Sequence, residues 1–288
     1  MEVVYLNGSL VPYSQARLSP YDYGFLHGYG LFETMRSYSG HIFRARQHLE
    51  RLKRSAELIG INLESSIPAL EAALYQTIQA NNLDNARIRL TVSIGEGSIV
   101  PNISSCASPT TFISASRFVS QTNHTGSKAI VSNIRRNSQS PLCHIKSLNG
   151  MDNILARNEA NSMGADQAIL LNEQGYIAES HSSNIFFVFK GSLITPDRDS
   201  GILPGITRDV VLELSQALGI EVIERKIGLN EAIKADEIFI TNSIVEIEAV
   251  SHISGRRIAS GRIGETTNRL IKAYSSLVQE ETTQWSKT

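Results

Sequence analysis

A polar segment without periodicity divides the sequence into two parts. Residues 120–127 have the sequence Ser-Gln-Thr-Asn-His-Thr-Gly-Ser and separate two runs that resemble β-strands. This composition is typical of a linker, because it offers no apolar face to bury. A chain of 288 residues is also long enough for two lobes, each with its own core. We expect a smaller N-terminal α/β domain over residues 1–119, a linker over 120–127 and a larger C-terminal α/β domain over 128–288.

Strand and helix patterns alternate in the N-terminal part. Asn7-Gly8 separates two short apolar runs and tolerates the positive φ of a tight hairpin turn. Apolar residues recur at helical spacing over residues 49–59, and the predicted helix ends at Gly60. Residues 87–94 alternate polar and apolar, which predicts a half-buried strand with Arg89 on its polar face.

The C-terminal part mixes hairpin-like strands with strands joined by helices. Strand patterns cover residues 129–134, 167–171, 176–179, 185–189, 220–224 and 237–241, and helix patterns cover 151–163 and 207–219. Because the two kinds of connection occur together, we expect an α/β fold of the mixed α+β type rather than a regular parallel sheet.

The charge and cysteine content of the chain limit the kinds of molecule that it is expected to bind. The formal net charge is −1, with no concentration of basic residues, so nothing indicates nucleic acid or an anionic membrane as a partner. The two cysteines have no metal-ligand spacing, and we expect neither a metal site nor a disulfide. No secretory leader and no apolar segment of about 20 residues is found. We expect a cytoplasmic protein that acts on small molecules.

One lysine and one glutamate lie at positions suited to catalysis. Lys146 directly precedes a predicted helix, and Glu179 ends an apolar strand where the chain enters the polar loop that begins at Ser180. A phosphorylated aldehyde cofactor with a pyridine ring needs an amine of depressed pKa and a carboxylate opposite the ring nitrogen. Lys146 is the candidate amine, and Glu179 is the candidate carboxylate.

A helix start offers a site for the phosphate of such a cofactor. Gly205 immediately precedes a predicted helix, and unpaired N–H groups in a first turn, here at Ile206 and Thr207, attract anions. The Thr207 hydroxyl adds a further donor.

Three other residues are candidate phosphate ligands. Arg51 lies on a predicted helix, and its guanidinium matches phosphate oxygens at two points. Asn242 and Ser243 follow a predicted strand and offer polar donors. His48 lies three residues before Arg51 and has no second candidate ligand nearby, so we assign it no role.

Taken in order, six segments resemble the signatures of the class IV aminotransferases, the fold type IV group of pyridoxal-phosphate enzymes. These segments are Gly24–Glu33, Gln47–Leu52, Lys146–Ala160, Ala178–Phe186, Leu203–Asp209 and Asp236–Ser243. The resemblance implies a homodimer of two-domain subunits, with pyridoxal 5'-phosphate (PLP) bound between the domains and near the subunit interface. It also implies that Lys146 forms the Schiff base and then acts as general base and acid at the substrate α-carbon.

The resemblance leaves three activities open. We favour a transaminase that moves an amino group between a branched-chain-like L-amino acid and a 2-oxo acid, because the segment around Lys146 looks most like the transaminases. The second is a 4-amino-4-deoxychorismate lyase, which releases pyruvate and 4-aminobenzoate and is similar at Phe32–Thr34 and Thr241–Ser243. The third is a D-amino-acid or (R)-amine transaminase, although residues 94–99 lack the arginine that D-enzymes place there and offer an acid instead.

Substrate residues are predicted from the same comparison of motifs. Branched-chain enzymes often have Tyr-x-Arg-Pro where this chain has Arg87-Ile88-Arg89-Leu90, so that Arg89 alone is shared. Arg89 is our candidate for binding a substrate carboxylate, and a structural salt bridge is the alternative. Phe32 and Thr34 are further candidate substrate contacts.

Overall fold

A computed structural model describes residues 2–106, 108–119 and 126–285. The chain divides into two compact units: the first is Met1–Ser120 with Lys146–Asn149 and Val278–Thr288, and the second is Gln121–Ile145 with Gly150–Leu277. The linker expected at 120–127 falls mainly on residues 120–125, outside the described residues, and stays a prediction. The division into units differs from the predicted domains at two places. Lys146–Asn149 and the chain from Val278 onward belong to the first unit.

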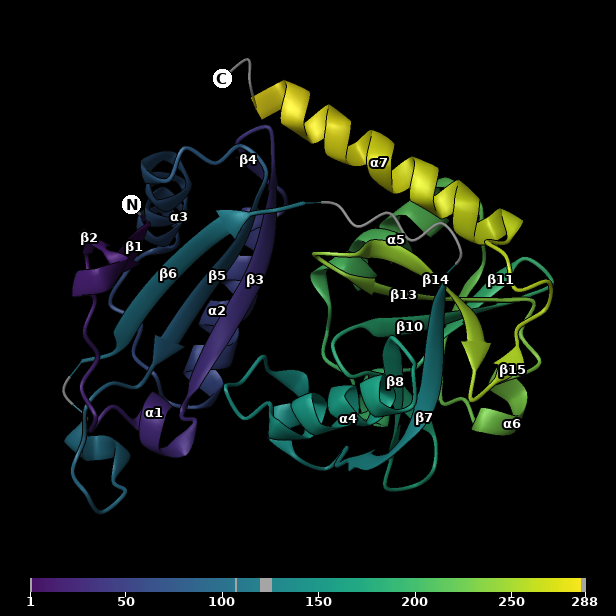
Figure 1. The fold of residues 1–288 in the computed structure, drawn as a ribbon, viewed down its shortest axis with the longest axis horizontal. Helices are drawn as coiled ribbons and strands as arrows, with labels where there is room; N and C mark the ends of the chain where they lie inside the picture. Colours follow the sequence, from purple (N-terminus) through teal and green to yellow (C-terminus); the bar gives the residue numbers. More distant parts are fainter. Residues whose placement is uncertain (1, 107, 120–125, 286–288) are drawn as a thin grey trace. The chain divides into compact units, whose positions relative to one another are not determined.

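The first unit is built on an antiparallel sheet. Within the described residues it has six strands in the order β2-β1-β6-β5-β3-β4 (Figure 1). The strands are β1 Val3–Leu6, β2 Ser9–Pro12, β3 Gly30–Tyr38, β4 His41–Ile42, β5 Ala86–Ser93 and β6 Thr110–Arg117. The turn predicted between β1 and β2 is confirmed, since φ is 45° at Asn7 and 95° at Gly8.

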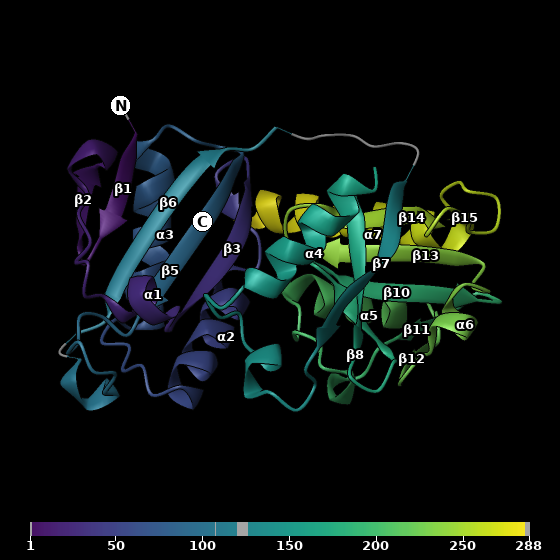
Figure 2. The same ribbon diagram turned by 60° about the horizontal axis from the view of Figure 1, so that its bottom comes forward.

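Two helices cover one face of this sheet (Figures 1 and 2). They are α2 Ala45–Leu58 and α3 Ile67–Ala80, and the short α1 Tyr23–His27 precedes β3. Alternate residues of β5, from Ala86 to Val92, are buried, whereas Arg87 is exposed and Arg89 half-buried. The alternation predicted for this strand is therefore confirmed, and it gives the sheet an apolar face and a more polar one.

The second unit contains the larger sheet. Within the described residues it has nine strands in the order β12-β11-β10-β13-β14-β7-β8-β9, with β15 paired to β14. The strands are β7 Ser127–Arg136, β8 Gln167–Asn172, β9 Ile177–Ser180, β10 Asn184–Phe189, β11 Ser192–Thr195, β12 Val222–Glu224, β13 Glu237–Asn242, β14 Glu246–Ile253 and β15 Arg256–Arg257. The pairs β7–β8, β7–β14 and β11–β12 are parallel and the others antiparallel. The expected mixed α/β fold is confirmed.

Apolar side chains cover both faces of this sheet. On one face, Ile130 of β7 and Leu170 of β8 pack with the small residues of α4 Met151–Ser162. Alternate residues such as Ile169 point to a second cluster with Ile185 and Ile240. The remaining helices are α5 Ile206–Ala217, α6 Leu229–Ala232 and α7 Glu265–Trp285, with 3-10 turns at Tyr13–Gln15, Ile103–Ser105, Pro141–His144 and Arg198–Ser200.

Several elements have no counterpart among the sequence predictions, among them β11, β14 and α7. In the part of the chain that the structure describes, no helix combines the length and the apolar composition needed to cross a membrane. The 21-residue α7 is the longest of these helices, and it contains charged residues along its length.

Candidate active site

Backbone hydrogen bonds hold Lys146 against the start of β3. The Lys146 carbonyl accepts from Phe32 N at 2.9 Å, and Leu148 N donates to the Gly30 carbonyl at 2.9 Å. A Cβ at Gly30 would lie 2.5 Å from the Val92 carbonyl oxygen and 2.7 Å from Leu148 Cδ1, so only glycine allows this close approach. The lysine segment is therefore fixed like an extra short strand, which limits the directions in which the Lys146 side chain can extend.

The Phe32 ring lies beneath two cations. Lys146 Nζ is 4.7 Å from the ring centroid, and Arg89 Cζ is 3.9 Å from it. Thr34 is paired with Arg89 across β3 and β5, so Phe32, Thr34 and Arg89 share the polar face of the sheet. The structure thus brings together all three residues predicted to contact substrate, next to the predicted catalytic lysine.

The Arg89 side chain makes no hydrogen bond or ion pair with any described residue, and its guanidinium contacts the Phe32 ring. Burial lowers the pKa of its guanidinium, and the charge of the neighbouring Arg87 lowers it further. The structural salt bridge considered for Arg89 has no acidic partner in the described part of the chain. A half-buried guanidinium without a counterion favours binding of an anionic group.

Glu33, on the opposite face of β3, is the centre of a buried cluster. Its carboxylate accepts from Arg51 Nε at 2.8 Å and from Arg51 Nη2 at 2.6 Å, and His48 Nδ1 lies 2.7 Å from Oε2. Burial raises the pKa of Glu33, but the charge of Arg51 and the contacts with His48 outweigh it and lower the pKa to about 2. Glu33 is therefore ionised, and it fixes the orientation of the Arg51 guanidinium.

His48 completes this cluster as a neutral ring. Burial lowers its pKa, the contact with Glu33 raises it, and the charges of Arg51 and Lys146 lower it again, with a net decrease. A neutral His48 with its proton on Nδ1 donates to Glu33. Sequence reasoning did not assign roles to Glu33 and His48. The available signal was an acidic residue at a core-facing position of a strand, with His48 and Arg51 one helical turn apart on the buried face of α2.

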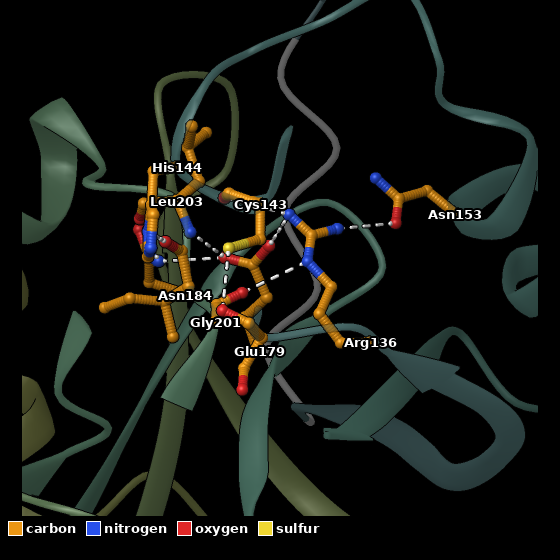
Figure 3. A network of polar contacts seen from close by, with 10 residues as sticks. Arg136, Cys143, His144, Asn153, Glu179, Asn184, Gly201 and Leu203 are labelled. Atoms are coloured by element: carbon orange, nitrogen blue, oxygen red, sulfur yellow. Dashed lines mark hydrogen bonds and ion pairs between the residues drawn. The ribbon is translucent and has the colours of Figure 1, made fainter. Parts of the chain in front are cut away.

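In the second unit, Glu179 is buried and held by three groups (Figure 3). Arg136 Nη2 is 3.0 Å from Oε1, while Leu203 N donates to Oε2 at 3.0 Å and Asn184 Nδ2 donates to it at 3.2 Å. Each of these donors stabilises the ionised carboxylate.

Arg136 is itself held by several acceptors (Figure 3). Its Nε donates to the Gly201 carbonyl at 3.1 Å, Nη1 to Asn153 Oδ1 at 3.2 Å and Nη2 to the Cys143 carbonyl at 3.2 Å. The guanidinium is therefore fixed beside Glu179 rather than free to rotate. The sequence analysis missed Arg136 and Asn184, because nothing local distinguishes them from a surface arginine and a turn asparagine.

The predicted phosphate segment begins α5. Gly205 is its N-cap residue and makes no side-chain cap, and a Cβ there would lie 1.9 Å from Asn184 Oδ1. Ile206 and Thr207 follow in the first turn, and both are buried. With no side chain capping it, the helix start presents its N–H groups and the positive end of its dipole to a ligand.

The side chain of Asn242 is already engaged in the fold. Its Oδ1 accepts from Ile244 N at 2.8 Å and Val245 N at 2.9 Å, and its Nδ2 donates to Ser183 Oγ at 2.8 Å. These bonds tie the turn after β13 to the loop that follows Glu179. Ser243 lies in the same turn, which places both predicted residues at the end of β13.

Comparisons with known proteins show the family of this chain. The amino-transferase class IV family matches residues 30–253. A Methanocaldococcus jannaschii protein provisionally named a branched-chain-amino-acid aminotransferase is 37% identical over 275 residues, which are 95% of this chain and 96% of that protein. The chain belongs to the class IV aminotransferase family and is an enzyme of that family.

Solved structures support the same conclusion. The Escherichia coli branched-chain amino acid aminotransferase matches with a TM-score of 0.92 and 30% identity, over 96% of this chain and 94% of that one. The enzyme from Thermobaculum terrenum, solved in its PLP form, matches with a TM-score of 0.87 and 31% identity over the same shares. The fold is therefore that of the fold type IV aminotransferases.

Proposed function

We propose that this protein is a PLP-dependent aminotransferase that moves an amino group between a branched-chain-like L-amino acid and a 2-oxo acid. The observation that carries the proposal is the buried Glu179 carboxylate, which three donors keep ionised. A buried carboxylate of this kind suits a protonated pyridine nitrogen. Lys146, which is held on β3, supplies the amine. We assign Lys146 and Glu179 to one cofactor because their segments resemble successive motifs of the family.

The chain's own groups fit this cofactor. Gly205 leaves no room for a side chain beside Asn184, and the uncapped start of α5 offers N–H donors at Ile206 and Thr207 to a phosphate. We assign further phosphate contacts to Arg51, Asn242 and Ser243. When bound, PLP supplies an electron-withdrawing ring that stabilises negative charge developing at the substrate α-carbon.

Lys146 would hold the cofactor through its amine. With substrate bound, its Nζ would serve as the general base and acid for the proton of the substrate α-carbon. The ionised Glu179 would face the ring nitrogen and favour its protonated form. Arg136 keeps that carboxylate from taking the proton itself, because a protonated Glu179 would leave the guanidinium without its counterion.

Arg89 is the proposed substrate-binding cation. Its guanidinium lacks an acidic partner among the described residues and lies over the ring of Phe32, whose other recorded cation is Lys146. A substrate carboxylate at Arg89 would be close to the group that moves the proton, and Phe32 and Thr34 would line the same face. The lyase and the D-amino-acid activities are not favoured, since the relatives and solved structures described above are branched-chain aminotransferases.

We also propose that the protein is a cytoplasmic homodimer. Met151, Ile154 and Leu155 follow one another at helical spacing on α4, and they are 67%, 57% and 47% exposed. Three large apolar residues on one exposed face suit burial against a second subunit. Light scattering of the purified protein tests this: we expect twice the chain mass, reduced to one chain mass in Ile154→Glu. A wild-type monomer that retains full transaminase activity would contradict it.

Absorbance of the purified protein with PLP tests the activity. We expect a visible band from covalently bound cofactor that L-leucine abolishes and 2-oxoglutarate restores, while D-alanine leaves it unchanged. Lys146→Ala is expected to lose the band, and Lys53→Ala, an exposed lysine on α2, to keep it. A band that no amino donor changes would overturn the transaminase assignment, and a response to D-alanine alone would overturn the L-specificity.

A further inference from the structure

Strand β7 contains an irregularity just before Arg136. Val131 pairs with Ile169 of β8, but the next recorded pair is Arg135 with Leu171. Three residues of β7, Ser132 to Ile134, therefore face the single residue Leu170. The strand has two more residues than its partner over this stretch, which is a β-bulge.

This bulge determines where Arg136 points. After it, Arg136 pairs with Asn172, whereas the register before the bulge would carry Arg136 two residues further, opposite Gln174 beyond the end of β8. At about 3.3 Å per residue, that shift is roughly 7 Å. The shift is more than twice the 3.0 Å that separates Arg136 Nη2 from Glu179 Oε1, so an unbulged β7 would remove the guanidinium from the carboxylate.

Glu159 of α4 binds the polar groups that the bulge exposes. Its carboxylate accepts from Ser132 Oγ at 2.5 Å, from Asn133 Nδ2 at 2.6 Å and from Asn133 N at 3.2 Å. Asn133 has no partner in the β7–β8 register, and Glu159 supplies the acceptor for its backbone N–H. The hydrogen bond from Ser132 lowers the pKa of Glu159 most, and those from Asn133 lower it further, so the carboxylate is ionised at neutral pH.

The same helix contacts Arg136 directly. Asn153, one and a half turns before Glu159 on α4, accepts from Arg136 Nη1 at 3.2 Å. Helix α4 therefore holds β7 within the irregularity, at Ser132 and Asn133 through Glu159, and just after it, at Arg136 through Asn153. Two side chains of one short helix, Glu159 and Asn153, thus hold both the bulge and the arginine that follows it.

We infer that Glu159 is a positioning residue of the active site, which clamps the β7 bulge so that Arg136 pairs with Glu179. The inference rests on the proposed function, because Glu179 matters in this way only if it faces the cofactor ring nitrogen. Glu159 acts through Arg136 and touches neither Glu179 nor the cofactor.

Glu159→Gln tests this inference, with Asp166→Asn as the matched control. Gln keeps the shape but turns an N–H group toward the donors of the bulge. Asp166 likewise accepts a hydrogen bond from a backbone N–H of β7, that of Lys128 at 2.9 Å, but at the far end of the strand from Arg136.

In Glu159→Gln we expect the PLP affinity to fall about tenfold, as for a lost charged hydrogen bond. The pH midpoint of the visible band should move upward, because a cation has left the site. Asp166→Asn should change neither.

A double-mutant cycle of Glu159→Gln with Arg136→Met distinguishes a positioning role of Glu159 from a general loss of stability. If Glu159 acts through Arg136, Glu159→Gln has no further effect on the pH midpoint in an Arg136→Met background. Ser132→Ala, which removes one donor from the same clamp, should shift the midpoint in the same direction by less. Equal midpoints in Glu159→Gln and Asp166→Asn, or additive effects of Glu159→Gln and Arg136→Met, would overturn the inference. A wild-type protein without the visible band would instead overturn the proposed function.

Discussion

At the scale of single residues, the buried cluster of Glu33, His48 and Arg51 shows how the fold prepares a cation before any ligand arrives. Glu33 neutralises Arg51, and His48 supplies a further donor without adding charge. Holding a guanidinium in this way reduces the entropy lost when it binds a phosphate. The fold also depends on this cluster for stability, since removing either Glu33 or Arg51 leaves the other charge buried without its partner.

Glu33→Gln should lower the free energy of unfolding by about 3–5 kcal/mol, because it leaves the Arg51 guanidinium buried without a counterion. Urea denaturation measures this. Glu50→Gln is the control: Glu50 lies on α2, the helix of Arg51, and pairs with Arg46, and these two side chains are 37% and 77% exposed. Its effect should stay within about 0.5 kcal/mol. Equal losses in the two variants would show that the cluster carries no special stability.

Protonation of the same carboxylate should lower the free energy of unfolding in acid. The pKa of Glu33 is lowered from 4.5 to about 2, so the folded state resists protonation that the unfolded chain accepts. The resulting stability is present above pH 4.5 and is lost as the pH falls toward 2, and its size is roughly 3 kcal/mol. Free energies of unfolding measured across this range should fall less steeply in Glu33→Gln than in the wild type. Parallel curves would contradict the pKa assignment.

His181 should make stability depend on pH in a second, higher range. Burial lowers its pKa from 6.5 to about 4, and the charge of Arg157 adds to this. Its Nδ1 accepts from Ala168 N at 3.3 Å, so the folded state holds the ring neutral. Stability should therefore decrease as the pH falls from 6.5 to 4, because only the unfolded chain takes up the proton. His181→Gln should remove part of that slope in the same unfolding measurement, and an unchanged slope would exclude His181 as its source.

At the scale of elements, local patterns were predictable and long-range ones were not. The β1–β2 turn and the alternation in β5 depend on neighbouring residues, so the sequence predicts them. Strand β14 has a broken alternation and pairs in parallel with β7, more than 100 residues away. Helix α7 receives its N-terminal cap from Glu237, which accepts from Thr266 N and Thr267 N. Neither partner can be recognised from the local sequence.

Gly205 yields a prediction at this scale. In Gly205→Ala, the added methyl group would lie 1.9 Å from Asn184 Oδ1, so either Asn184 or the first turn of α5 must move. We expect a loss of about 1–3 kcal/mol in stability and a weaker affinity for PLP, since both elements serve the proposed site. Gly228 is the control: it is the N-cap of α6, and a Cβ there meets nothing within 4 Å. Gly228→Ala should retain wild-type PLP affinity, and equal losses in both variants would contradict the steric argument.

At the scale of the whole molecule, the candidate site draws on residues that are distant in sequence. Motifs identified Lys146 and Glu179 because their neighbours resemble family signatures. Arg136 carries no such signal, since it acts through Glu179, which is 43 residues away. Glu33 lies in a segment that resembles a signature, but that segment does not indicate its partner His48, which is 15 residues away. The membership of the lysine segment in the first unit was equally hidden, because it depends on pairing with β3, more than 100 residues earlier in the chain. Sequence periodicity does not record contacts of that range.

The C-terminal end of α7 is a second segment that belongs to the first unit. Trp285 stacks on Tyr75 of α3, with 5.7 Å between ring centroids, and Glu281 pairs with Arg44 at 3.1 Å. Trp285→Ala should therefore destabilise the first unit by about 1–2 kcal/mol, counting the stacked pair and part of the buried ring area. Hydrogen exchange should show faster opening of α3 amides and unchanged protection of β10 amides in the second unit, which serve as an internal control. Equal acceleration in both would mean that the two units unfold as one cooperative body, and unchanged α3 protection would mean that the stacked pair contributes no stability.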